Sequence, residues 1–106
     1  MNINIKATNI DLTPALREYV EEKIGSLKKF TSRWDLEGGV STAVEVGRTT
    51  KHHNKGDVYR AEVNIKIPHG FLRAEHEGPD VRLAIDKVRD ILQIEIEKQK
   101  GKELNR

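Results

Sequence analysis

Cysteine is absent from this sequence, and only five of its 106 residues are aromatic. Without cysteine the chain cannot form disulfides, zinc ribbons or thiol nucleophiles, so these classes of protein are excluded. The few aromatic residues are not interleaved with basic ones, which argues against a surface that stacks the bases of a single strand. No stretch approaches the roughly 18 consecutive apolar residues that a membrane-spanning helix needs. The composition therefore predicts a protein without disulfides, thiol chemistry or membrane spans.

Charge of neither sign is in large excess, because the sequence has 19 basic and 17 acidic residues and a formal net charge of +2. A net charge this small does not by itself point to nucleic acid. The positive charge is nevertheless unevenly spread, with 13 basic and 10 acidic residues from Arg48 onward, against 6 and 7 before it. The later part of the chain is therefore the better candidate for contact with an anionic partner.

The length of the chain suits one two-layer domain. We expect this domain to span residues 1–100, followed by a polar tail at 101–106. The N-terminal segment MNINIKATNI has no charged region followed by an apolar core, so no signal peptide is expected. The sequence predicts a cytoplasmic protein that does not bind membranes.

Four strands are expected from the alternation of apolar and polar residues, which places successive side chains on opposite faces of a sheet. The clearest alternation covers residues 58–67. Shorter patterns predict the other strands at residues 1–7, 36–46 and 71–77. Gly38 and Gly39 fall inside the second strand and suggest a bulge. Residues 31–35, which include the only tryptophan, Trp34, are expected to form a connection.

Two helices are expected, each with a recognisable beginning. Thr13 can cap free backbone N–H groups and Pro14 suits a first helical position, so the first helix starts there and runs to about Lys29. Pro79 and Asp80 mark the start of the second helix in a similar way. Apolar residues at helical spacing would bury one face of each helix. These core residues are Leu16, Val20, Ile24 and Leu27 in the first helix, and Val81, Ile85, Val88, Leu92 and Ile96 in the second.

The expected order of elements is β-α-β-β-β-α, which is an α+β fold. Crossovers through the two helices would place both of them on one face of a four-stranded, mostly antiparallel sheet. Double-stranded-RNA-binding domains have the same layout of two helices on a sheet. No internal repeat, low-complexity tract or linker interrupts the chain, so one domain is predicted.

Histidine is the residue type that most suggests chemistry, yet the spacing of His52, His53, His69 and His76 argues against a metal site. His52 and His53 are adjacent, so on a strand they would point to opposite faces. No nearby carboxylate cluster completes a set of ligands. No serine lies in a nucleophile elbow, and no glycine-rich phosphate loop is present. We therefore expect no metal, no cofactor and no catalytic residue, and hence no enzymatic activity.

Nucleic-acid binding is the hypothesis that the charge pattern favours, because phosphate recognition needs several lysines and arginines on one surface. Candidates lie near the end of the first helix, in the polar tip between the second and third strands, and along the second helix. They are Lys23, Lys28 and Arg33; Arg48, Lys51, Lys55 and the nearby Arg60; and Arg82 and Arg89. Recognition of the shape and backbone of folded RNA fits this composition better than base stacking.

Residues 12–23, LTPALREYVEEK, resemble the first helix of the bacterial ribosome hibernation promoting factor family, also called the ribosome-associated inhibitor or protein Y family. Residues 72–75, 80–87 and 92–98 are similar to later segments of that family, and so is the polar tip with its histidine pair. The resemblance is spread over the whole chain. The family fold, β-α-β-β-β-α, agrees with the order expected from the residue patterns.

The resemblance implies a function. Family members bind the small (30S) subunit of the 70S ribosome, in the channel between head and body where messenger RNA and tRNA would lie. They block initiation and preserve idle ribosomes in starvation or stationary phase. By resemblance, the partner is 16S ribosomal RNA and the contacts come largely from the two helices. The basic residues that this nominates are Lys23, Lys28, Lys87, Lys98 and Lys100, with the polar tip as an addition.

The chain departs from the family pattern in ways that affect the expected contacts. Arg82 stands where members usually carry an aromatic residue, and Glu95 and Glu97 add negative charge to a run that is usually basic and rich in glutamine. Because the chain stops at Arg106, the resemblance implies a short form without the C-terminal dimerisation domain of long members. Such a protein is expected to be a monomer when free.

Two other functions stay open at this point. The first is a generic structured-RNA-binding module that acts on non-ribosomal RNA. The second is an enzyme that uses His52 or His53 as an acid or base. The first of these shares the expected fold with the ribosome-binding hypothesis, so only the partner would separate them.

Overall fold

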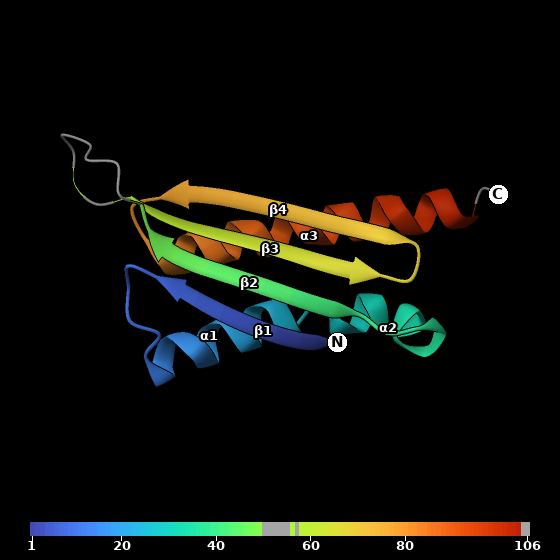
Figure 1. The fold of residues 1–106 in the computed structure, drawn as a ribbon. Coiled ribbons are helices and arrows are strands. Elements are labelled where there is room, and N and C mark those ends of the chain that lie inside the picture. The colour runs from blue at the N-terminus through green and yellow to red at the C-terminus, as the bar shows by residue number, and fades with distance from the viewer. Residues whose placement is uncertain (50–55, 57, 105–106) are drawn as a thin grey trace.

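The computed structural model describes residues 1–49, 56 and 58–104, which form a four-stranded sheet with helices on one of its faces (Figure 1). The elements in chain order are β1 (Asn2–Thr8), α1 (Pro14–Gly25), α2 (Lys28–Glu37), β2 (Ser41–Arg48), β3 (Tyr59–Ile67), β4 (Gly70–Gly78) and α3 (Val81–Leu104). The expected α+β class and four-stranded sheet are confirmed. The described residues form three helices, however, so the two-helix layout expected from the caps and apolar periodicity, and its likeness to double-stranded-RNA-binding domains, are wrong in this respect.

The sheet is mixed, with the strand order β1-β2-β3-β4. β1 pairs with β2 in parallel, whereas the β2–β3 and β3–β4 pairs are antiparallel. The expectation of a mostly antiparallel sheet therefore holds for two of the three pairs. Parallel neighbours need a long crossover that returns the chain to the same end of the sheet. Together α1 and α2 form that crossover, and they pack behind the sheet (Figure 1).

The segment between α1 and β2 is helical, which corrects several expectations. The first helix ends at Gly25, and residues 31–35 lie within α2 instead of forming a connection. The strand expected from residue 36 begins at Ser41. Gly38 and Gly39 are not a bulge within a strand, because their backbone N–H groups both donate to one carbonyl in the last turn of α2. Gly39 has a φ of 97°, a value that glycine adopts readily.

Trp34 gives the physical reason for this helix. Leu27, Thr31 and Trp34 are all fully buried and follow one another at helical spacing. Because Thr31 is polar, the sequence pattern hides this buried face. Trp34 also donates a hydrogen bond from Nε1 to the carboxylate of Glu103 at 3.1 Å, which links α2 to the end of α3.

The core lies between the sheet and the helical layer. All nine residues predicted to line the helices are in it; eight are buried and Val81, at the start of α3, is partly buried. They pack with alternate residues of the strands, such as Val44, Val63 and Ala74. The last helix is longer than expected, since residues 101–104 continue α3 where a polar tail was predicted. Residues 105–106 lie outside the described part of the chain.

Gly47 is required where β1 and β2 approach each other. It pairs with Thr8, and a Cβ atom added to Gly47 would lie 2.6 Å from the Thr8 carbonyl oxygen. The Gly47→Ala variant should therefore lower the free energy of unfolding by about 1–3 kcal/mol, because the two backbones must separate. Urea unfolding measures this. Gly101→Ala is the matched control, since its Cβ meets open space on α3 and should stabilise the helix by up to about 1 kcal/mol. Equal stability of the two variants would contradict this account.

Candidate RNA-binding surface

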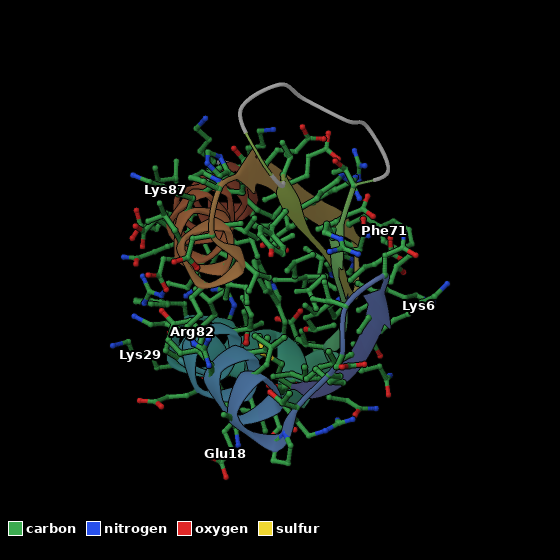
Figure 2. The ribbon with its side chains drawn as sticks, turned by 90° about the vertical axis from the view of Figure 1, so that its left-hand side faces the viewer. Lys6, Glu18, Lys29, Phe71, Arg82 and Lys87 are labelled. Atoms are coloured by element: carbon green, nitrogen blue, oxygen red, sulfur yellow. The ribbon has the colours of Figure 1, made fainter. Side chains whose placement is uncertain are left out.

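Most of the predicted RNA-binding residues lie on the helical side of the molecule. Viewed along the length of the sheet, Arg82 and Lys87 extend from the helical side, as does Lys29, whereas Lys6 and Phe71 lie on the opposite side with the sheet (Figure 2). Eight of the twelve candidate basic residues are on the three helices. They are Lys23 on α1, Lys28 and Arg33 on α2, and Arg82, Lys87, Arg89, Lys98 and Lys100 on α3.

The structure brings α1 against the first half of α3 along a polar seam. The seam consists of Tyr19 and Lys23 from α1 and Ser26 directly after it, with Arg82, Asp86 and Arg89 from α3. The Tyr19 hydroxyl donates to Asp86 Oδ1 at 2.6 Å, and Lys23 Nζ lies 3.6 Å from the same oxygen. One turn further on, Arg89 Nε donates to Ser26 Oγ at 3.0 Å. These contacts advance along both helices together, so α1 and α3 run in the same direction.

Tyr19 is the centre of the seam. The Arg82 guanidinium carbon and Lys23 Nζ lie 5.3 Å and 5.7 Å from the centre of its ring, within the range of cation–π attraction. The hydrogen bond to Asp86 and partial burial raise the pKa of Tyr19 to about 12. The phenol therefore stays protonated, and keeps donating to Asp86, up to a higher pH than an ordinary tyrosine would.

A group of basic residues lies on the later half of α1, the start of α2 and the first half of α3. We call Lys23, Lys28, Lys29, Arg82, Lys87 and Arg89 the basic helical surface. Lys28, Lys29 and Lys87 are exposed, and none has a carboxylate within 4 Å among the described residues. By contrast, Arg33 lies 3.7 Å from carboxylate oxygens of both Glu37 and Glu103. Lys28, Lys29 and Lys87 therefore carry charges that stay available to a ligand.

The outer face of the sheet is different, because its two arginines are already paired. Arg60 forms ion pairs with Glu62 at 3.4 Å and with Glu75, and it lies 3.9 Å from Glu45. Arg73 contacts Glu62 and Glu75 as well. The hydrogen bond from Arg73, supported by the nearby charge of Arg60, lowers the pKa of Glu62. This network occupies both arginines with carboxylates, so neither guanidinium is available to a phosphate without giving up those pairs.

Comparison with known proteins identifies the family. The model of the Sigma 54 modulation protein / S30EA ribosomal protein family matches residues 3–103. The chain is 33% identical over its whole length to the ribosome hibernation promoting factor of Azotobacter vinelandii, of which it covers 89%. The chain belongs to the ribosome hibernation promoting factor family. This confirms the resemblance that the sequence motifs indicated.

Other members of the ribosome hibernation promoting factor family show the fold and the range of lengths. The solved N-terminal domain of Thermus thermophilus protein Y superposes with a TM-score of 0.75 at 29% identity, covering 92% of this chain and 98% of that domain. The ribosome hibernation promotion factor of Deinococcus radiodurans is 33% identical over 91% of this chain. The chain spans about half the length of that relative, 47%.

Not every predicted residue joins the basic helical surface of this family member. Lys51 and Lys55, together with His52 and His53, lie outside the described residues. Arg48 ends β2, at the end of the molecule where α1 and α3 begin (Figure 1). Lys98 and Lys100 lie on the later half of α3, away from the seam, and Lys98 is 3.7 Å from Glu95.

Four residues of this region, Tyr19, Ser26, Lys29 and Asp86, were not among the site residues expected from the sequence. Arg82, Asp86 and Arg89 recur at intervals of four and three, which places them on one side of a helix. That spacing signals a polar stripe on α3. It does not reveal that the stripe meets α1, because the contacts join residues more than sixty positions apart.

The described residues offer little for other chemistry. No group of three or more histidine, aspartate or glutamate side chains among them is placed to hold a metal ion. A hollow of about 860 Å³ between α2 and the β3–β4 turn is lined by polar and apolar residues, including Glu37, Lys66 and Pro68. No helix in the described ranges is long and apolar enough to cross a membrane.

The sheet network predicts a pH-dependent stability. A carboxyl whose pKa falls on folding stabilises the native state above its unfolded pKa, near 4.5, and loses this contribution as the pH drops through the folded-state value. Glu62→Gln should therefore lower the free energy of unfolding at neutral pH, and its difference from wild type should shrink in acid. Urea unfolding at a series of pH values measures this.

Glu77→Gln is the matched control for that variant, because Glu77 is on the neighbouring strand and has no ion-pair partner in the described part of the chain. It should change stability little at any pH. A Glu62→Gln effect that stayed constant from neutral to strongly acidic pH would refute the role of the lowered pKa.

Proposed function

We propose that this protein binds the small ribosomal subunit in the channel for messenger RNA and tRNA, blocks initiation by occupying that space, and preserves inactive ribosomes under stress or starvation. The observation that carries the proposal is the one-sided basic helical surface of a chain that belongs to the ribosome hibernation promoting factor family. The partners are the 30S subunit, free or within the 70S ribosome, and its 16S ribosomal RNA. We further propose that the free protein is a cytoplasmic monomer.

The distribution of charge supports an orientation in which the helices face ribosomal RNA. Lysine and arginine heads that contact phosphates release condensed counterions, and each such contact adds affinity. Lys29 and Lys87 extend into solvent from the helical side (Figure 2). On the sheet side, Arg60 and Arg73 are held by glutamates and would have to give up those pairs to bind phosphate. The helical side is therefore the favourable one for RNA.

Steric occlusion explains the function without catalysis. A rigid two-layer domain that fits an RNA channel excludes other occupants simply by filling it. Phosphate contacts position such a protein, and no base-specific contact is required for this mechanism. The protein would act by reversibly occupying the channel and not as an enzyme.

Charge reversal on the helical side tests the orientation. A Lys29→Glu, Lys87→Glu double variant should bind 30S subunits about tenfold or more weakly, because two phosphate contacts become repulsive. Both residues are exposed, so the fold should survive. The control is Lys6→Glu with Lys66→Glu, which makes the same change of charge on the sheet side and should bind nearly as well as wild type. Co-sedimentation with purified 30S subunits measures both, and equal losses would contradict the orientation.

Salt dependence and partner choice test the nature of the interaction. Binding to 30S subunits should weaken steeply as salt rises, because counterion release drives phosphate contacts. In a competition titration at one salt concentration, 30S subunits should bind at least about tenfold more tightly than a free RNA duplex, since only the channel matches the shape of the domain. Equal affinity for both would favour the alternative, a generic structured-RNA-binding module that acts on non-ribosomal RNA.

A further inference from the structure

The seam contains an acidic residue in the middle of the basic helical surface. Asp86 lies on α3 between Arg82 and Arg89, and its carboxylate oxygen is 3.6 Å from Lys23 Nζ. A carboxylate at this place repels phosphate and lowers the local positive potential. Its presence on an RNA-binding surface therefore requires a compensating role.

Asp86 and Asp90 differ in what they contact, although they are neighbours on the same helix. The Asp90 side chain is 69% exposed and lies near Arg89 of its own helix, at 3.5 Å. The Asp86 side chain is 36% exposed, and it reaches across the seam to two residues of α1. It accepts the short hydrogen bond from the Tyr19 hydroxyl and pairs with Lys23.

The Tyr19 ring connects this carboxylate to the two cations. With its hydroxyl fixed by Asp86, the ring is held where both Arg82 and Lys23 lie within 6 Å of its centre. Free lysine and arginine side chains sample many rotamers and lose that freedom when they bind a ligand. A cation already restrained by an aromatic ring and a carboxylate loses less freedom on binding.

We propose that Asp86 and Tyr19 are positioning residues that hold Lys23 and Arg82 at a fixed spacing across the α1–α3 seam, ready to contact neighbouring phosphates of ribosomal RNA. The inference rests on the proposed function and adds to it a role for two residues that do not themselves bind phosphate. It also explains why an acidic group lies inside the basic helical surface. The affinity gained by ordering Lys23 and Arg82 exceeds the affinity lost to the negative charge of Asp86.

Two aspartate variants separate positioning from simple electrostatics. Asp86→Ala and Asp90→Ala each remove one negative charge from the same helix, so electrostatics alone predicts that both bind 30S subunits more tightly. Positioning predicts that Asp86→Ala binds about threefold to tenfold more weakly, whereas Asp90→Ala binds as well as wild type or better. The measurement is a titration of labelled protein with purified 30S subunits at low and moderate salt. Equal behaviour of the two variants, in either direction, would overturn the proposal.

Tyr19→Phe removes the hydroxyl without changing the charge or the ring. It should weaken 30S binding in the same direction as Asp86→Ala, and combining the two changes should add little, because they break one interaction. Wild-type affinity of Tyr19→Phe would overturn the role of the hydrogen bond. Thermal unfolding of each variant confirms that the compared proteins are folded at the assay temperature.

Tyrosine ionisation reports on the pair without reference to RNA. The tyrosinate absorbance of Tyr19 is obtained by subtracting the signal of Tyr19→Phe from that of the wild type. It should titrate with a pKa of about 12 in the wild type. In Asp86→Ala the pKa should fall toward the ordinary value of 10.0, and an unchanged value would show that Asp86 does not hold the phenol. If wild-type protein fails to bind 30S subunits, the proposed function itself fails. If it binds and Asp86→Ala binds equally well, only the positioning role fails.

Discussion

The parallel pairing of β1 with β2 is the constraint on which the rest of the molecule depends. A parallel neighbour requires the chain to cross behind the sheet, and here the crossover consists of α1 and α2. The same face receives α3, so all three described helices form one layer while the other face of the sheet stays open (Figure 1). This arrangement brings residues near position 23 beside residues near position 86. The basic helical surface exists only because of that crossover.

Basic side chains on the two faces of the domain differ in whether they are paired with carboxylates. On the sheet, Arg60 and Arg73 contact glutamates two positions along their own strands and diagonally across the β3–β4 pair, so each guanidinium has a carboxylate partner. On the helical layer, Lys28 and Lys87 are exposed on different helices, and neither has a carboxylate within 4 Å among the described residues. A chain with a net charge of only +2 can therefore present one face to an anionic partner. The uneven distribution of charge between the two faces, more than the net charge, makes the helical face basic.

The helical layer is tied together by polar contacts at both ends. Near its beginning, Tyr19 and Asp86 connect α1 to α3, and near its end Trp34 and Glu103 connect α2 to α3. Between them lies the apolar core beneath the helices. Hydrogen bonds to charged groups depend strongly on geometry. The Tyr19–Asp86 and Trp34–Glu103 hydrogen bonds therefore fix the spacing between the helices. Apolar contacts are less directional and set that spacing only approximately.

The sequence by itself determined the number of strands, the start of the helices at Pro14 and Val81 and their buried faces, because caps and periodic patterns are local properties. The resemblance of its segments to known proteins indicated the family. The sequence also indicated that the binding groups are basic. The tertiary structure alone decided that residues 28–37 are helical and that β1 is parallel to β2. It also decided which cations share a surface, grouping Lys23 and Arg82 and leaving Lys98 apart. The reason is that a buried threonine hides a helical pattern, and contacts between residues 67 positions apart leave no mark in local sequence.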